Sequence, residues 1–282
     1  MTTIFRYTLA RFRGQIIGWG IAMFLLGLMM VSFYDTVAKQ QEQFNELLKS
    51  YPPEMMAFFG DISAFATPEG YLSTEYFSLM PLILGIFVVL SGSGLLAGDE
   101  EKGTLDLILA HPVSRTSLFM GRLLALVLAT IIVLAIGWLG IIVSMSQSSM
   151  DVGWGRMALP FLSLLAVLTI FGMLALLLSL LLPSRRMSAM AAGLALVASF
   201  FITGLGRISD SLKTLAKLSP LNYYQSGYAI SGLNGEWLGG LLAAAVVFAA
   251  LAWWRFERRD IRVGGESGWG LRLPWRKPSS AS

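Results

Sequence analysis

The chain has 282 residues, of which 55% are hydrophobic and 13% are charged, with a formal net charge of +4. Soluble domains carry about twice this share of charged residues, so an ordinary soluble fold, a disordered chain and a disulfide scaffold are excluded. There is no cysteine and only one histidine, which leaves no thiol chemistry and no histidine cluster for a metal or for acid–base work. These numbers indicate a polytopic membrane protein.

Residues 1–14 form a short amphipathic segment before the first apolar stretch. Phe5, Leu9 and Phe12 fall on one helical face, with arginines beside it. This pattern predicts a helix lying in the cytoplasmic membrane interface. The apolar run that follows has 19 residues. A signal-peptide core has roughly 7–15, so we expect this run to be a retained membrane helix.

Six stretches of the chain are apolar and uncharged over close to the length of about 20 residues that a membrane-spanning helix needs. They predict six transmembrane helices, within a transmembrane domain at 15–254, at residues 16–34, 79–97, 123–144, 157–182, 187–206 and 237–254. The stretches do not alternate between polar and apolar residues, which favours helices over transmembrane strands. The predicted fold class is therefore an all-α polytopic membrane protein.

The connecting segments contain further helical patterns. The long outer loop, residues 35–74, carries an apolar helical face that stops at Pro52 and Pro53. The second outer element, residues 207–235, begins with an amphipathic pattern and breaks at Pro220. We therefore expect helical outer loops. Residues 255–282 form a basic tail rich in glycine and proline.

Lysine and arginine residues beside the spans set the orientation of a membrane protein. With the N terminus in the cytoplasm, 15 of the 21 basic residues lie on the cytoplasmic side and 6 on the outer side. We therefore expect both termini to be cytoplasmic, in a prokaryotic cell (plasma or inner) membrane. Because the basic surplus follows topology and forms no face with stacking aromatic residues, it gives no support to nucleic-acid binding.

The segment between the second and third spans, residues 98–122, is the one sizeable cytoplasmic loop. Three acidic residues are followed by a glycine and then by a short helical pattern that Pro112 ends. Leu105, Ile108 and Leu109 share one helical face, which suggests a docking surface for a partner. The alternative is a solvated loop whose acidic residues interact with nearby basic ones.

This segment resembles the corresponding segment of the ABC type 2 transporter permeases, the membrane subunits of one class of ATP-binding-cassette exporters. The six-span layout and the Leu-Ser-Pro-x-x-Tyr-Tyr run at residues 218–224 are also similar to this family. The chain departs from the family pattern at Arg122, where a lysine is commoner. The matching positions are Glu100, Glu101, Gly103, Thr104, Leu105, Leu107, Leu109, Pro112, Ser114, Arg115, Gly121 and Arg122.

The resemblance implies a coupling helix at residues 104–110 that docks on a separate ATP-binding subunit. The chain has no Gly-x-x-x-x-Gly-Lys-Ser/Thr run, so we expect ATP and Mg to bind to that subunit, with no cofactor, metal site or catalytic residue on this chain. The residues expected to couple the two subunits are Glu100, Glu101, Gly103, Thr104, Leu105, Ile108, Leu109, Pro112 and Arg115.

The resemblance also implies that two copies of the chain pair with two copies of the ATP-binding subunit. Small residues spaced four apart allow close helix contact in lipid. This spacing occurs in the first, fifth and sixth spans, the last at Gly239/Ala243 and Gly240/Ala244. The resemblance implies that the first and fifth spans build the homodimer contact, at Gly14, Gly18, Ala22, Ala189 and Gly193. Large apolar side chains on the first span, which also suit lipid-facing packing, are candidates for lining a substrate pathway: Met23, Phe24, Met29 and Met30.

The expected function is export of an apolar or amphipathic substrate. A secondary transporter is the first alternative, but the spans carry no ionisable residue at mid-depth for ion coupling. An intramembrane enzyme is the second, and the lone His111 lies in a loop without a metal-binding pattern. The third alternative is a membrane scaffold or sensor, which would not respond to ATP hydrolysis by a partner.

Overall fold

The computed structural model describes residues 1–39, 67–105, 108 and 113–258. In these ranges the regular elements are helices, which agrees with the predicted all-α fold. The helical patterns expected within the long outer loop fall in residues 40–66, and most of the basic tail falls in residues 259–282, so both lie outside the described residues.

Five helices are long and apolar enough to cross a membrane. They correspond to the first, third, fourth, fifth and sixth predicted spans. These helices are α1 (Thr2–Lys39), α8 (Arg115–Met145), α9 (Trp154–Leu181), α10 (Arg185–Ile208) and α12 (Gly235–Arg258).

The remaining predicted span, residues 79–97, is shorter than expected and is bent. It corresponds to α5 (Met80–Gly94), and Pro68–Phe77, which comprises α4 (Pro68–Tyr71) and the π-helix η2 (Leu72–Phe77), meets it at an angle of 43°. The break follows from Pro81, whose missing amide hydrogen cannot continue the helical hydrogen bonding back to Phe77. At its other end α5 stops before the short helix α6 (Ala97–Glu101).

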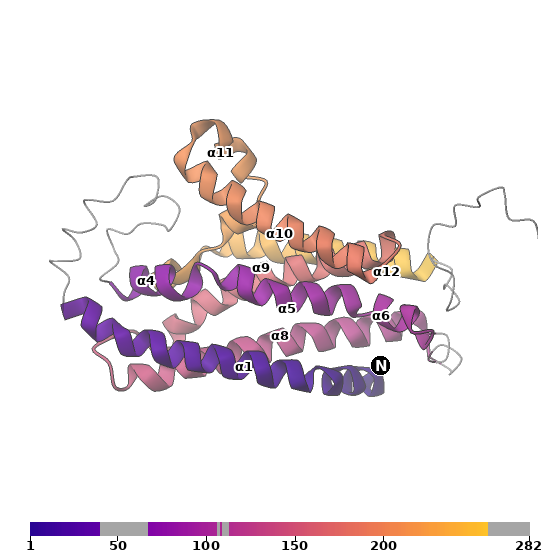
Figure 1. Ribbon diagram of the computed structural model, residues 1–282, viewed down its shortest axis with the longest axis horizontal. Coiled ribbons are helices and arrows are strands. Elements are labelled where there is room, and N and C mark those ends of the chain that lie inside the picture. The colour runs from indigo at the N-terminus through magenta and orange to yellow at the C-terminus, as the bar shows by residue number, and fades with distance from the viewer. Residues whose placement is uncertain (40–66, 106–107, 109–112, 259–282) are drawn as a thin grey trace, which may run out of the picture.

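The helices run back and forth between two ends of the molecule. One end, here called the joint end, holds the start of α1, helix α6, the starts of α8 and α10, and the end of α12 (Figure 1). The opposite end, here called the far end, holds the end of α1, the loop between α8 and α9, and the start of α12. Because α1 starts and α12 ends at the same end, the bent pair must supply the sixth crossing.

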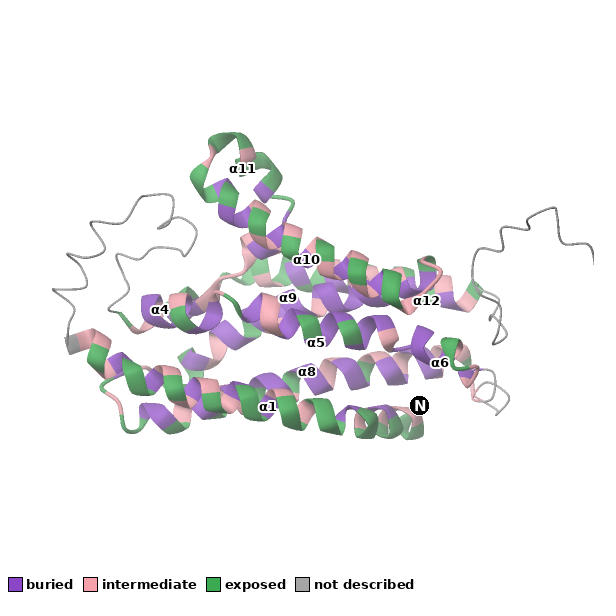
Figure 2. Ribbon diagram, viewed as in Figure 1, coloured by how far each residue is buried: buried purple, intermediate pink, exposed green. Residues whose placement is uncertain are grey.

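Helix α9 lies at the centre, with 67% of its most apolar window buried, against 28% for α1 and 17% for α12. It packs against α5, α10 and α12, whereas α1 packs chiefly along α8. Figure 2 shows the corresponding contrast between the mainly buried central helices and the exposed stripes of α1 and α10.

Short helices form the far end between α10 and α12. They are α11 (Asp210–Ala216) and the 3₁₀-helices η3 (Pro220–Tyr223) and η4 (Ser226–Ile230), which agrees with a helical second outer element. A buried hydroxyl cluster holds this segment to α10: the Ser219 hydroxyl lies 2.6 Å from that of Ser199 and 2.7 Å from that of Thr203.

The predicted interfacial helix at residues 1–14 is not a separate element, because α1 continues without a break from Thr2 to Lys39. At about 1.5 Å per residue such a helix is about 57 Å long, well beyond the hydrocarbon core of about 30 Å. Its first turns pack on the start of α8, where Ile4 lies against Gly121 and the side chain of Phe12 is buried. The apolar face recognised in the sequence thus faces protein and not the membrane surface.

Glycines let α1 and α8 approach closely. A side chain at Gly140 would clash with the backbone of Phe24, and one at Gly27 would press on Ile141. At the far end, the Asp35 carboxylate of α1 accepts hydrogen bonds from the backbone N–H and the hydroxyl of Ser149, at 2.8 and 2.6 Å. The two helices are therefore held together along their length.

We expect Gly140→Ala to lower the free energy of unfolding by roughly 1–3 kcal/mol, the usual cost of overpacking a close contact. The matched control is Gly155→Ala, because nothing lies within 4 Å of a Cβ there. Alanine is favoured over glycine in a helix by about 1 kcal/mol, so the control is expected to be neutral or stabilising. Thermal unfolding of the purified variants in detergent measures both. Equal shifts in the two variants would contradict the close α1–α8 approach.

Candidate functional site

A buried ion cluster lies at the joint end of the molecule. Asp99, on α6, is only 4% exposed. Its Oδ2 lies 2.6 Å from Nη2 of Arg122 on α8 and 3.0 Å from Nη1 of Arg11 on α1. Arg122 also donates from Nη1 to the Leu95 carbonyl oxygen, at 2.6 Å. One carboxylate thus connects the loop after α5 with two spanning helices.

The burial of each side chain determines how strongly the stability of the fold depends on its ion pair. The side chains of Arg122 and Asp99 are 3% and 6% exposed, whereas that of Arg11 is 43% exposed. A buried charge is tolerated only when a partner compensates its lost hydration. Asp99 and Arg122 are therefore mutually dependent, while the contact to Arg11 is partly screened by solvent.

The same aspartate anchors the start of the predicted coupling helix through its backbone. The Asp99 carbonyl oxygen accepts hydrogen bonds from the Thr104 backbone N–H at 2.9 Å and from its hydroxyl at 3.2 Å. Between them Gly103 has φ 65°, in the left-handed region that favours glycine. The turn that leads out of α6 is therefore fixed at both the glycine and the threonine.

Glu101 and Arg115 connect this region to the last two spans. Glu101 Oε1 accepts a hydrogen bond of 2.8 Å from the backbone N–H of Arg185, the first residue of α10. Arg115 donates to the carbonyl oxygens of Phe256 and Glu257 at 3.3 and 3.4 Å. These carbonyls lie at the end of α12, where a cation is favourable. Glu100, which directly precedes Glu101 in the sequence, is half-buried.

The predicted docking face is only partly described. Leu109 and Pro112 lie outside the described residues, as does His111. Leu105 is 2% exposed and belongs to the hydrophobic core, and Ile108 is half-buried against that core. The expectation that Leu105 presents an open apolar face is therefore wrong, because the turn at Gly103 directs its side chain into the chain itself.

The residues predicted to form a dimer contact lie on the surface of this chain. Gly14, Gly18 and Ala22 are exposed along α1, while Ala189 and Gly193 are half-exposed on α10. Nothing within the chain lies within 4 Å of a Cβ built at Gly14, Gly18 or Gly193. The structure holds one chain, so the pairing stays a prediction, but both faces have room for a partner helix.

The residues predicted to line a pathway do not lie together. Met23 is 4% exposed and packs against Gly137, which contradicts a substrate-lining role for it. The backbone of Phe24 forms the close contact with α8, and the carbonyl of Met30 accepts a hydrogen bond from Tyr71 at 2.8 Å. Met29 is exposed, at 47%. α1 therefore uses most of this stretch for packing against its neighbours.

A cavity of about 220 Å³ at the far end, between η2–α5, α10 and the segment before α12, is instead a candidate for a substrate site. Its lining combines apolar side chains such as Phe200 with hydroxyls and the guanidinium of Arg207. Spacing alone did not indicate this cavity, because its walls come from segments far apart in the sequence. Within the described ranges, no three histidine or acidic side chains are grouped to hold a metal ion.

Sequence reasoning missed the central position of Asp99 and Arg11. Asp99 directly precedes the family motif that begins at Glu100 but is not one of its matching positions. Arg11 was used only as one of the basic residues that set the membrane orientation. The sequence feature that could have indicated this cluster is the position of three acidic residues at one end of a short segment and of Arg122 at its other end. Which acid is buried depends on tertiary packing.

A family model described as ABC-2 family transporter protein matches residues 9–261, which include most of α1 and every later helix described above. No curated protein matches the chain. The family match confirms the resemblance inferred from the motif after the second span.

We expect Asp99→Asn to destabilise the protein by about 3–5 kcal/mol, because it leaves the buried Arg122 without a counter-charge. The control is Asp151→Asn, which removes the same charge at an exposed position. The double variant Asp99→Leu with Arg122→Met removes both buried charges and should recover much of the loss. Thermal unfolding in detergent compares the three. A double variant as unstable as Asp99→Asn alone would contradict the ion-pair explanation.

Proposed function

The chain belongs to the ABC-2 family of transporter proteins and is a multi-pass permease subunit of an ABC transporter; from this we propose that it exports an apolar or amphipathic substrate, driven by ATP hydrolysis on a separate ATP-binding subunit. The observation that carries the coupling proposal is the bonding of the segment after Gly103 to Asp99 and, through it, to α1 and α8. The joint end is cytoplasmic in this proposal.

The contacts at the joint supply a route for mechanical coupling. A partner that pushes on residues 104–112 acts on α6 through Thr104, and α6 is held to α1 and α8 by the Asp99 cluster. Glu101 extends the connection to α10, and Arg115 extends it to α12. Residues 99–104 therefore have bonded contacts to three spanning helices, and Arg115 of α8 continues the connection to α12, which suits a rigid-body movement of the permease.

The ATP-binding subunit would dock on the surface around residues 104–112 and not on the side chain of Leu105, which is buried. Nucleotide and Mg would bind to that subunit, because this chain has no phosphate-binding loop motif. An amphipathic cargo is favoured by the mixed lining of the cavity between α5 and α10, where apolar walls adjoin hydroxyls and Arg207.

Two copies of the chain would pair about a two-fold axis, the commonest symmetry of homo-oligomers. The stripe at Gly14, Gly18 and Ala22 is flanked by the exposed apolar side chains of Ile17 and Ile21. Small residues flanked by apolar ones suit close contact between membrane helices.

We expect Arg11→Gln to uncouple transport from ATP hydrolysis while the protein stays folded. The contact to Asp99 is partly exposed, so its loss should cost at most about 1 kcal/mol of stability. Removing it releases α1 from the joint, and the ratio of substrate transported to ATP hydrolysed should fall several-fold in proteoliposomes that contain the ATP-binding subunit. Arg13→Gln is the control, because the described residues include no ion pair to Arg13. Equal coupling ratios in the two variants would refute this role.

The homodimer proposal has its own test, because the chain contains no cysteine and single cysteines can be introduced. Ala22→Cys should form a cross-linked dimer in the membrane with a short bifunctional reagent. Val246→Cys, at a position 66% exposed on α12, should remain monomeric. Cross-linking at Val246 but not at Ala22 would place the contact on another face.

A further inference from the structure

A second cavity, of about 540 Å³, lies between α9, α10, α12 and the segment that precedes α12. This volume falls in the range of about 300–1,000 Å³ that is usual for small-molecule sites. It is separate from the joint, and its lining residues differ from those of the cavity between α5 and α10. Neither the coupling contacts nor the proposed dimer contact accounts for it.

The interior of this cavity is apolar. α9 contributes Ile170, Phe171 and Leu174, and α12 contributes Ala244 and Phe248. The hydroxyl of Ser199, which also lines the cavity, is already engaged with Ser219. The deep part of the cavity therefore suits a hydrocarbon chain.

The mouth of the cavity carries charge and aromatic rings. Glu236 is the one charged side chain among the lining residues. Beside it, the rings of Tyr223 and Trp237 meet edge to face, with centroids 5.9 Å apart. An ammonium group is attracted both by a carboxylate and by the open face of an aromatic ring.

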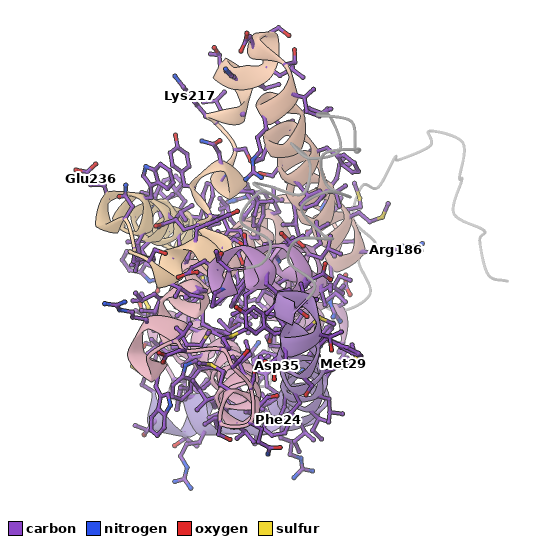
Figure 3. The ribbon with its side chains drawn as sticks, turned by 90° about the vertical axis from the view of Figure 1, so that its left-hand side faces the viewer. Phe24, Met29, Asp35, Arg186, Lys217 and Glu236 are labelled. Atoms are coloured by element: carbon purple, nitrogen blue, oxygen red, sulfur yellow. The ribbon has the colours of Figure 1, made fainter. Side chains whose placement is uncertain are left out.

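A basic residue lies close to the same cavity. The hydroxyl of Tyr223 donates to the carbonyl oxygen of Lys217 at 2.8 Å, which places the Lys217 backbone beside the cavity. Among the described residues no ion pair to Lys217 occurs. Figure 3 shows Lys217 and Glu236 on the same side of the molecule. These contacts bring the Lys217 backbone near the cavity, and Glu236 is the charged residue that lines it.

The cavity has the depth of a lipid chain. Trp237 lies in the first turn of α12, at the end of a span, where aromatic residues meet lipid head groups. Phe248 lies eleven residues further along the helix, which is about 16 Å at 1.5 Å per residue. The lining therefore extends from head-group level to about the middle of a hydrocarbon core of about 30 Å.

We infer that this cavity binds one membrane lipid with an amine-bearing zwitterionic head group, of the phosphatidylethanolamine class. The amine lies against Glu236 and the aromatic pair, and one acyl chain fills the apolar interior. The proposed dimer contact does not fill this role, because Figure 3 shows Glu236 on the opposite side from Met29 of α1, and the dimer-contact residues of α10, Ala189 and Gly193, are not among the lining residues.

The open space beside α12 supplies a sharp test. A Cβ at Gly240, which lines the cavity, has nothing within 4 Å, so Gly240→Leu places a branched side chain in the space that the acyl chain would occupy. Gly239 is equally open, but it is not among the lining residues. Gly239→Leu is therefore a control with the same change of side chain, one position away.

The experiment uses the full chain in phosphatidylglycerol nanodiscs, without the ATP-binding subunit, so its result does not depend on the proposed function. Phosphatidylethanolamine and phosphatidylglycerol probes, each with a diazirine at the same acyl position, are photoactivated, and the adducts are located by mass spectrometry. The amine-bearing probe should label α9 and α12 about two- to fivefold more than the other, the range expected for an exposed ion pair. Thermal unfolding of each variant confirms that it is folded.

Gly240→Leu should abolish the labelling of these helices, Gly239→Leu should leave it unchanged, and Glu236→Gln should remove the preference between head groups. Equal labelling of the wild-type chain by both probes, or labelling that survives in Gly240→Leu, would overturn the proposal. A third probe, a soluble diazirine-bearing alkyltrimethylammonium, separates the lipid from a freely diffusing amphiphile. Labelling by this probe alone would refute a lipid as the occupant.

Discussion

The buried carboxylate of Asp99 is the constraint on which the joint end depends. The negative charge of Asp99, which is 4% exposed, requires a compensating positive charge. Arg122 supplies this charge from α8, which follows α6 in the chain after residues 102–114. This pairing fixes α6 against α8, and the partly exposed Arg11 brings α1 to the same place. Because Thr104 is bonded to the Asp99 carbonyl oxygen, the same residue also holds the start of the segment after Gly103, where coupling is proposed.

The rest of the fold divides into two groups of helices with different partners. α1 and α8 approach closely at Gly140 and are tied at the far end by Asp35, while α5, α10 and α12 pack around α9. Gly92 lies so close to the Gly172 carbonyl that a side chain there would clash, so α5 and α9 also approach closely. The Asp99 cluster joins these groups, because its carboxylate belongs to the segment after α5 and its cations belong to α1 and α8.

The membrane class and most spans follow from the sequence, because hydrocarbon thickness imposes a length that composition reveals. The bend between residues 68–77 and α5 was not predicted, since hydropathy does not register the break before Pro81. Nor was the continuity of α1, because an amphipathic face at Phe12 looks the same whether lipid or protein covers it. At the site, Gly103 and Thr104 were recognised from a motif, whereas the burial of Asp99 and Leu105 depends on long-range packing that no local pattern encodes.

The burial of Leu105 changes where force would enter the permease. An exposed leucine at the partner interface would make coupling a matter of side-chain docking, which flexible rotamers can absorb. Leu105 instead packs into the core, and the adjoining turn is held by Gly103 and by the two hydrogen bonds of Thr104. A displacement of this segment therefore cannot be absorbed locally without breaking the core contact or exposing a buried charge. The lower-cost response is for the bonded helices to move together, which is the condition that ATP-driven rocking of a permease requires.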